Sequence, residues 1–353
     1  MTGFRELPAA QLAAQQALQT RHFLPYFSIV LTQRYLIQIQ ANKLSSAQLN
    51  KQPVITTLES NMHTWQIGDV KITKIVELES VGGSRFILPD ATPEAVLKHD
   101  WLSPHFINDE GKLIMSVHAL IVETPTKTII VDTCLGNDKK RNIPAWNNLQ
   151  LPFLEDLEAA GFTREDIDIV LCTHLHVDHV GWNTMLVDGA WVPTFPKARY
   201  IMAKSEFEYW TEEAEGEEYA TIMADSVRPV FEAGLVDLVP ITHQICEEVV
   251  LEPTPGHTPG HVSVHIQSRE QHAVITGDSI HHPCQIAETT WSSSADYDSA
   301  QATQTRQDFL SLYADKETLI IGTHFATPTA GHVKRVGTGY ELSVEGGSEE
   351  TLA

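Results

Sequence analysis

The sequence predicts an α/β protein in which two sheets are covered by helices. Strand-like segments come in runs with helical segments between them, the pattern expected of layered sheets and helices. An unbroken apolar run over 167–172 has the length of a strand and no alternation, which indicates burial on both faces. The 353 residues suffice for one large domain or two small ones with a sizeable core.

The first round of elements opens with a hairpin over 65–77, because its two strand-like halves flank a Gly68-Asp69 turn. Gly161 is placed to end a preceding helix, since glycine accepts the left-handed backbone that follows a last helical turn. The other elements predicted here are strands over 113–123, 126–132 and 167–172 and a helix over 152–160.

A second round of elements follows, and it includes an acidic segment. Ser205 is placed to cap the helix after a strand over 198–202. Seven glutamates fall between Glu206 and Glu218, and we interpret them as a solvated helix end and loop because nothing fixes a converging geometry. The remaining predictions are strands over 235–240, 248–251, 262–266, 273–276 and 318–321 and a helix over 300–313.

The chain is acidic, with 46 Asp and Glu against 24 Lys and Arg and a formal charge of −22. Such a chain repels phosphate backbones and anionic surfaces, so we expect no nucleic-acid and no membrane partner. No apolar run approaches the roughly 18 residues of a transmembrane helix. The four cysteines form no CxxC pair, which argues against a disulfide framework and favours a reducing, cytoplasmic compartment.

Residues 1–61 differ in composition from the rest of the chain. They carry five Lys or Arg and two Glu, a net charge of +3, and they are rich in glutamine. We interpret 1–61 as a poorly defined N-terminal extension, with Met62 as an alternative start. The main domain is then expected over 62–353.

Histidine is frequent, with 17 residues, and the densest cluster is CTHLHVDHVG over 172–181, directly after the buried strand. Four metal-type ligands within six residues at a buried edge are costly unless something satisfies them, and a metal does. Alternate residues of an extended segment point the same way, so His174 and His176 can share one metal. Asp178 and His179 follow where the chain turns, and they can reach a second position.

Three further places supply additional ligands. His257 lies in a rigid TPGHTPGH turn, while Asp278 and His324 each end an apolar, strand-like run. Each signal is weak alone, but with the first cluster they make seven ligands, enough for two metals. Imidazole and carboxylate ligands suit zinc, iron, manganese or cobalt.

The motifs HLHVDH, PGHTPGH, TGD and GTH, in this order, resemble those of the metallo-β-lactamase-fold hydrolase superfamily over roughly 62–333. The resemblance implies an αββα sandwich of two mixed sheets flanked by helices, with a dinuclear site at one edge. It also implies that Asp278 bridges the metals and that Asp132 supports the metal loop from behind. By the same resemblance the first metal is held by His174, His176 and His257, and the second by Asp178, His179 and His324.

Differences from the motifs of particular branches indicate which branch of the superfamily this sequence resembles. Asp278 is a bridging-type carboxylate, unlike true β-lactamases, and the intact His176 disfavours the electron-transfer branch. The segment over 277–285 resembles the branch of methyl-parathion-type phosphotriesterases and lactone- or ester-hydrolysing relatives. Acyl-homoserine lactonases of this fold place a tyrosine three residues after the bridging aspartate. His281 stands there instead, which weighs against that substrate.

We therefore expect a hydrolase that uses two divalent metal ions, zinc first, and a metal-bridging hydroxide on a lactone or carboxyl ester. Asp178 would orient the hydroxide, and His281 would either assist the leaving group or pack behind the ligands. Trp146, Trp182 and Phe325 are candidate pocket walls, which favours a small, uncharged, hydrophobic substrate.

Alternative functions stay open at this stage. A phosphotriesterase is the nearest, followed by a glutathione thioester hydrolase and a non-catalytic metal-binding protein on the same fold. Relatives in this superfamily are often dimers, and a homodimer is expected on that resemblance alone.

Overall fold

The computed structural model describes residues 63–213 and 216–344. The expected N-terminal extension, 1–61, lies outside the described residues. Within the described part, no helix combines the length and the apolar character that a membrane span requires.

The first sheet contains seven strands within the described residues, in the order β1-β2-β3-β4-β5-β8-β9. Three antiparallel pairs, from the β1–β2 hairpin to β3 with β4, lead into the parallel pairing of β4, β5, β8 and β9. The sheet is therefore mixed, as the sequence predicted. The strands are β1 (Thr64–Ile67), β2 (Val70–Val81), β3 (Ile114–Glu123), β4 (Thr128–Val131), β5 (Ile169–Leu171), β8 (Arg199–Ala203) and β9 (Val236–Val239).

The second sheet has six strands within the same part of the chain, in the order β10-β11-β12-β13-β14-β15. Its pairs are antiparallel except for β12 with β13, which run parallel. A separate hairpin joins β6 (Thr184–Val187) and β7 (Ala190–Pro193). The strands of the second sheet are β10 (Val249–Pro253), β11 (Val262–Ser268), β12 (Gln271–Ile275), β13 (Leu319–Ile321), β14 (Ala330–Val336) and β15 (Gly339–Ser343).

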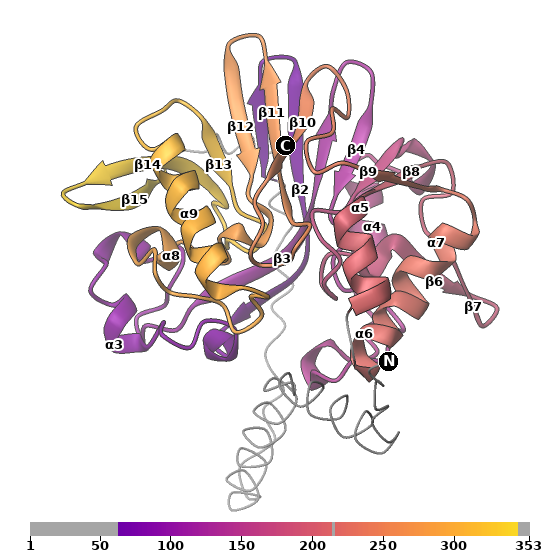
Figure 1. Cartoon of the computed structure of the whole chain (residues 1–353), viewed down its shortest axis with the longest axis horizontal. Helices are drawn as coiled ribbons and strands as arrows, with labels where there is room; N and C mark the ends of the chain where they lie inside the picture. Colours follow the sequence, from indigo (N-terminus) through magenta and orange to yellow (C-terminus); the bar gives the residue numbers. More distant parts are fainter. Residues whose placement is uncertain (1–62, 214–215, 345–353) are drawn as a thin grey trace, which may run out of the picture. The chain divides into compact units, whose positions relative to one another are not determined.

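Helices cover the outer face of each sheet, and the inner faces pack on one another (Figure 1). One buried cluster joins side chains of both sheets, a second lies under α4 to α7, and a third lies under α3, α8 and α9. This is the αββα sandwich, so the predicted fold class is confirmed. The helices are α3 (Pro93–Val96), α4 (Phe153–Ala159), α5 (Lys204–Glu208), α6 (Glu217–Ile222), α7 (Arg228–Glu232), α8 (Cys284–Ala287) and α9 (Ser299–Tyr313).

Strand β5 shows why an unbroken apolar run was informative. Val170 faces the helices, whereas Ile169 and Leu171 face the second sheet, so both faces are buried. Gly161 follows α4 with a φ of 93°, as its predicted role at the helix end requires.

Other local predictions differ from the structure. Helix α5 starts at Lys204 with Ala203 as its N-cap and no side-chain cap, so Ser205 lies inside the helix rather than capping it. The acidic segment is not wholly solvated, because Glu206 is buried. The β6–β7 and β14–β15 hairpins were not predicted from the sequence.

Candidate metal centre

Parallel strands bring the first metal-type residues to one edge of the first sheet. Strands β4 and β5 pair in parallel, with Val131 beside Leu171, so the segments that follow them leave the sheet together. Asp132 follows β4, and its backbone N–H donates to Leu171 O at 2.9 Å. The loop that carries His174 and His176 follows β5. Asp132 follows the last residue of β4 directly, and only Cys172 and Thr173 separate the end of β5 from His174.

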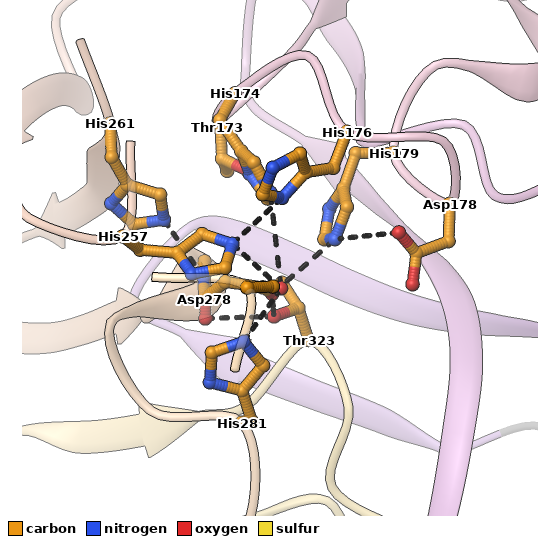
Figure 2. A network of polar contacts seen from close by, with 12 residues as sticks. Thr173, His174, His176, Asp178, His179, His257, His261, Asp278, His281 and Thr323 are labelled. Atoms are coloured by element: carbon orange, nitrogen blue, oxygen red, sulfur yellow. Dashed lines mark hydrogen bonds and ion pairs between the residues drawn. The ribbon is translucent and has the colours of Figure 1, made fainter. Parts of the chain in front are cut away.

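The second sheet delivers its residues in the same way. Strands β12 and β13 are also parallel, with Ile275 beside Ile321, so Asp278 and His324 emerge at one edge. The loop between β10 and β11 carries His257. Thr173 O accepts from Val262 N–H at 3.1 Å and ties this sheet to the loop after β5. Side chains from both sheets therefore meet in one place (Figure 2).

Three imidazoles and a carboxylate form the first group, with one ligand atom from each lying within 4.8 Å of the others. His176 Nδ1 lies 3.0 Å from His174 Nε2 and 2.8 Å from His257 Nε2. Asp278 Oδ2 lies 3.8 Å from His174 Nε2 and 3.5 Å from His257 Nε2. These four side chains are the set expected for the first metal together with the expected bridge.

The second group consists of Asp178, His179 and His324, again with ligand atoms within 4.8 Å. The Nε2 atoms of the two histidines lie 3.2 Å apart, and Asp178 lies 3.7 Å from His179 and 3.6 Å from His324. Asp278 Oδ1 lies 3.3 Å from His179 Nε2 and 3.2 Å from His324 Nε2. Asp278 therefore turns one oxygen to each group.

Hydrogen bonds on the far side of the rings decide which nitrogens point inward as lone pairs. His257 Nδ1 donates to Asp296 at 2.9 Å, His179 Nδ1 to Asp132 at 2.8 Å and His324 Nδ1 to Ser116 O at 3.0 Å. Carboxylate and carbonyl oxygens can only accept, so these rings carry their proton on Nδ1. In the neutral form of these rings, the Nε2 atoms face neighbouring nitrogens with no proton of their own.

The arrangement around Thr173 has the same effect on His174. Thr173 Oγ1 donates to Asp132 Oδ2 at 2.8 Å and accepts from His174 Nδ1 at 3.0 Å, which leaves His174 Nε2 as a lone pair. Converging lone pairs repel unless a cation lies between them. The donor set therefore fits divalent metal ions, with the outer partners fixing ring orientation.

Electrostatics supports a positive occupant. Burial lowers the pKa of His174 and of His257 well below the usual value, so both rings are neutral, the form that binds metal. Burial acts to lower the pKa of His179 too, but Asp278 and Asp132 outweigh it and hold that pKa well above its usual value. Carboxylates that stabilise a proton on a ring also stabilise a metal cation in its place.

His281 lies beside His257 and Asp278, and its side chain makes no hydrogen bond within the described residues. It is buried, its ring lies 4.7 Å from that of His257, and Nε2 lies 3.3 Å from Asp278 Oδ2. Among the described residues, neither ring nitrogen has a hydrogen-bond partner. Burial lowers the pKa of His281 to about 3, so the ring is neutral at pH 7 and carries a single N–H.

The structure places two of the three expected pocket walls in the core instead. Trp182 stacks on Phe153 and donates Nε1–H to Glu77 at 2.7 Å. None of the surface of Phe325 is exposed, and its ring packs on Phe106. Trp146 is partly exposed beside an exposed phenylalanine, and its role in a pocket stays a prediction.

Several supporting residues were missed from the sequence. Asp296 fixes His257 from the segment before α9, and Trp210 packs edge-on against His176 at 5.2 Å. His261 accepts from Asp278 N–H through Nε2 at 2.8 Å, and a Cβ on Gly277 would lie 2.5 Å from that nitrogen. The signal for His261 was present in the repeated PGH of the TPGHTPGH segment. No local pattern marked Asp296 or Trp210.

Comparison with known proteins identifies the class. The sequence matches the family described as "Metallo-beta-lactamase superfamily" over residues 114–324, more than half of the chain. The chain belongs to this superfamily and is a metal-dependent hydrolase. No match was found among curated protein sequences.

Solved structures show the same fold. AidC, described as a dizinc quorum-quenching lactonase, matches with a TM-score of 0.67 and 21% identity, over 81% of this chain and 98% of that one. AbOPH, described as a hydrolase in the beta-lactamase superfamily, has a TM-score of 0.67 and 23% identity, over 82% and 99%. A probable metal-dependent hydrolase from Staphylococcus aureus has a TM-score of 0.60 and 18% identity, over 79% and 99%.

Proposed function

We propose that this protein hydrolyses a lactone or carboxyl ester at a dinuclear metal centre. The observation that carries the proposal is the position of Asp278, whose two oxygens face two separate groups of metal-type ligands. His174, His176 and His257 would hold one ion, and Asp178, His179 and His324 the other. Zinc is the first choice, because these are its usual ligands. The structural similarity to a lactonase described as dizinc supports this choice.

Two bound ions would polarise the scissile bond and lower the pKa of a water molecule toward neutrality. Asp278 holds the two ligand groups at a fixed separation because one carboxylate serves both. Asp178 and His176 are the two expected ligands that are only partly buried, and the side chain of Asp178 is 14% exposed. Asp178 can therefore accept a hydrogen bond from incoming water. These residues orient the attack rather than forming a covalent intermediate.

His281 is proposed to stabilise the departing oxygen. Its ring is neutral at pH 7, and its N–H makes no hydrogen bond within the described residues, so it can donate to a leaving alkoxide. A buried donor without a partner costs free energy, and a substrate oxygen would remove that cost. The same reasoning applies to the leaving group of a lactone or of an open-chain ester.

The substitution His281→Phe tests this role, because it removes the donor and keeps a flat ring. We expect kcat for a lactone to fall by about 100- to 1000-fold, the range for one donor that acts on developing charge. His281→Gln, which keeps an N–H, should retain more activity. Equal kcat in the wild type and both variants, at equal metal content, would contradict the assignment.

The substrate class is tested by comparing a γ-lactone with an acyl substituent, a simple carboxyl ester and an aryl dialkyl phosphotriester on one zinc-reconstituted preparation. We expect kcat/KM of about 10⁴ M⁻¹s⁻¹ or higher for the lactone or the ester, within the ordinary enzyme range. The phosphotriester should be hydrolysed far more slowly. The reverse ranking would replace the proposal by a phosphotriesterase function.

A further inference from the structure

One glutamate of the acidic segment, Glu206, is buried. Glu206, in the first turn of α5, has a relative exposure of 1%, whereas Glu208, two residues on, is exposed. A buried carboxylate is costly unless its oxygens receive hydrogen bonds. The partners of Glu206 therefore show what its burial achieves.

The carboxylate of Glu206 accepts from three separate segments. Leu175 N–H donates to Oε1 at 3.1 Å, and Trp210 Nε1–H donates to the same oxygen at 2.6 Å. Gly260 N–H donates to Oε2 at 2.9 Å. Burial raises the pKa of Glu206, and these N–H donors act in the opposite direction by favouring the charged form.

Each of these segments carries or contacts an expected ligand of the first metal. Leu175 lies between His174 and His176, so its backbone position sets the loop on which both rings depend. Gly260 lies in the TPGHTPGH turn, three residues after His257. Trp210 packs edge-on against His176, with ring centroids 5.2 Å apart. Glu206 thus joins loops from the two sheets and the aromatic ring beside them.

The contact with the TPGHTPGH turn is too close for a side chain. A Cβ on Gly260 would lie 2.3 Å from the backbone nitrogen of Glu206 and 2.6 Å from its Cα. The turn therefore rests directly on the start of α5. This close approach lets the Gly260 N–H reach the carboxylate of Glu206.

We propose that Glu206 is a positioning residue for the first metal, holding the loops of His174, His176 and His257 in one fixed arrangement. The proposal rests on the proposed dinuclear centre and adds to it a residue outside the ligand set. A carboxylate suits this task, because both oxygens accept. An amide of the same shape would turn an NH₂ group toward either Gly260 N–H or the Leu175 and Trp210 donors.

The test is the substitution Glu206→Gln, with Glu208→Gln as the matched control on the same helix. Zinc content after dialysis, zinc affinity by chelator competition and the visible spectrum of bound Co²⁺ are measured on each full-length protein. We expect Glu206→Gln to weaken one of two sites by about 10-fold or more, the lower range for partners behind a ligand. Glu208→Gln should bind both ions as the wild type does.

Asp178→Asn serves as a comparison, because Asp178 is an expected ligand of the second group alone. If each variant keeps one ion, the two Co²⁺ spectra should differ, since different sites survive. Wild-type affinity for both ions in Glu206→Gln would overturn the proposal, and so would identical spectra in the two variants. A wild-type protein that binds fewer than two ions would instead overturn the proposed function on which it rests.

Folding is checked separately by the melting temperature of each metal-free protein. If Glu206→Gln is not recovered folded, Trp210→Phe takes its place, because it keeps a ring beside His176 and removes one donor to Glu206. The proposal then predicts a weaker first site and an unchanged second site. Unchanged affinity of both sites in Trp210→Phe would overturn it.

Discussion

Replacing Asp132 by asparagine should weaken metal binding, most directly at the second site, where Asp132 contacts the ring of His179 itself. Asp132 Oδ1 accepts from Thr173 N–H, and Oδ2 accepts from Thr173 Oγ1 and from His179 Nδ1, each at 2.8 Å. Asparagine has one oxygen in place of two, so its NH₂ group must face one of these donors. If the NH₂ group faces His179, Nδ1 must accept and the ring proton moves to Nε2. His179 Nε2, the atom that would bind the second ion, then has no free lone pair.

The magnitude follows from the kind of contact that is lost. Partners behind a metal-binding histidine contribute about 10- to 100-fold to affinity, which is roughly 1.4 to 2.7 kcal/mol. Asp132 has a φ of 57°, a left-handed conformation that asparagine accepts, so the substitution adds little backbone strain. We therefore expect affinity for the second ion to fall by that range while the fold is kept.

Stepwise zinc binding measured against a chromophoric chelator provides the assay. Asp188→Asn is the matched control, because Asp188 also has a left-handed backbone, with a φ of 50°, but lies exposed in the β6–β7 turn. The control should bind zinc as the wild type does. Unchanged affinity for both ions in Asp132→Asn would refute the view that Asp132 fixes the ring of His179.

Two further predictions concern stability away from the ligands. Asp225 is the buried partner of two cations: Arg141 donates to it at 2.7 and 2.9 Å, and Lys139 Nζ lies 3.7 Å away. Asp225→Asn removes that charge, so the free energy of unfolding in urea should fall by about 3 to 5 kcal/mol. A loss below about 1 kcal/mol would contradict this expectation. Burial raises the pKa of Glu77 from 4.5 to about 7, so the folded state binds this proton more tightly than the unfolded state. The stability of the wild type relative to Glu77→Gln should therefore decline between about pH 4.5 and pH 7, by on the order of 3 kcal/mol in total, and a pH-independent difference would contradict that assignment.

Much of the fold was predictable because local patterns carried it. The apolar run over 167–172 indicated a central strand, and its residues indeed face two different cores. The Gly68-Asp69 turn placed the first hairpin. Parallel pairing then explains why Asp278 and His324, 46 positions apart in sequence, end at the same edge.

The supporting residues were harder to predict because their roles depend on long-range burial. Glu206 looks like its acidic neighbours in sequence, and only the packing of α5 against two loops separates it from Glu208. Trp182 and Phe325 follow ligand motifs directly, yet both side chains point into cores. The residues expected as ligands therefore come together in the structure, whereas two residues adjacent to them in sequence pack in the core.

The central claim is that two metal ions held by these seven side chains make the protein a hydrolase of lactones or esters. The most direct measurement is the rate of hydrolysis of an acyl-substituted γ-lactone by metal-free protein titrated with zinc. Activity should be absent without metal and should rise until about two equivalents are bound, the stoichiometry of a two-metal site. Full activity in the metal-free protein, or activity complete at one equivalent, would contradict the dinuclear account.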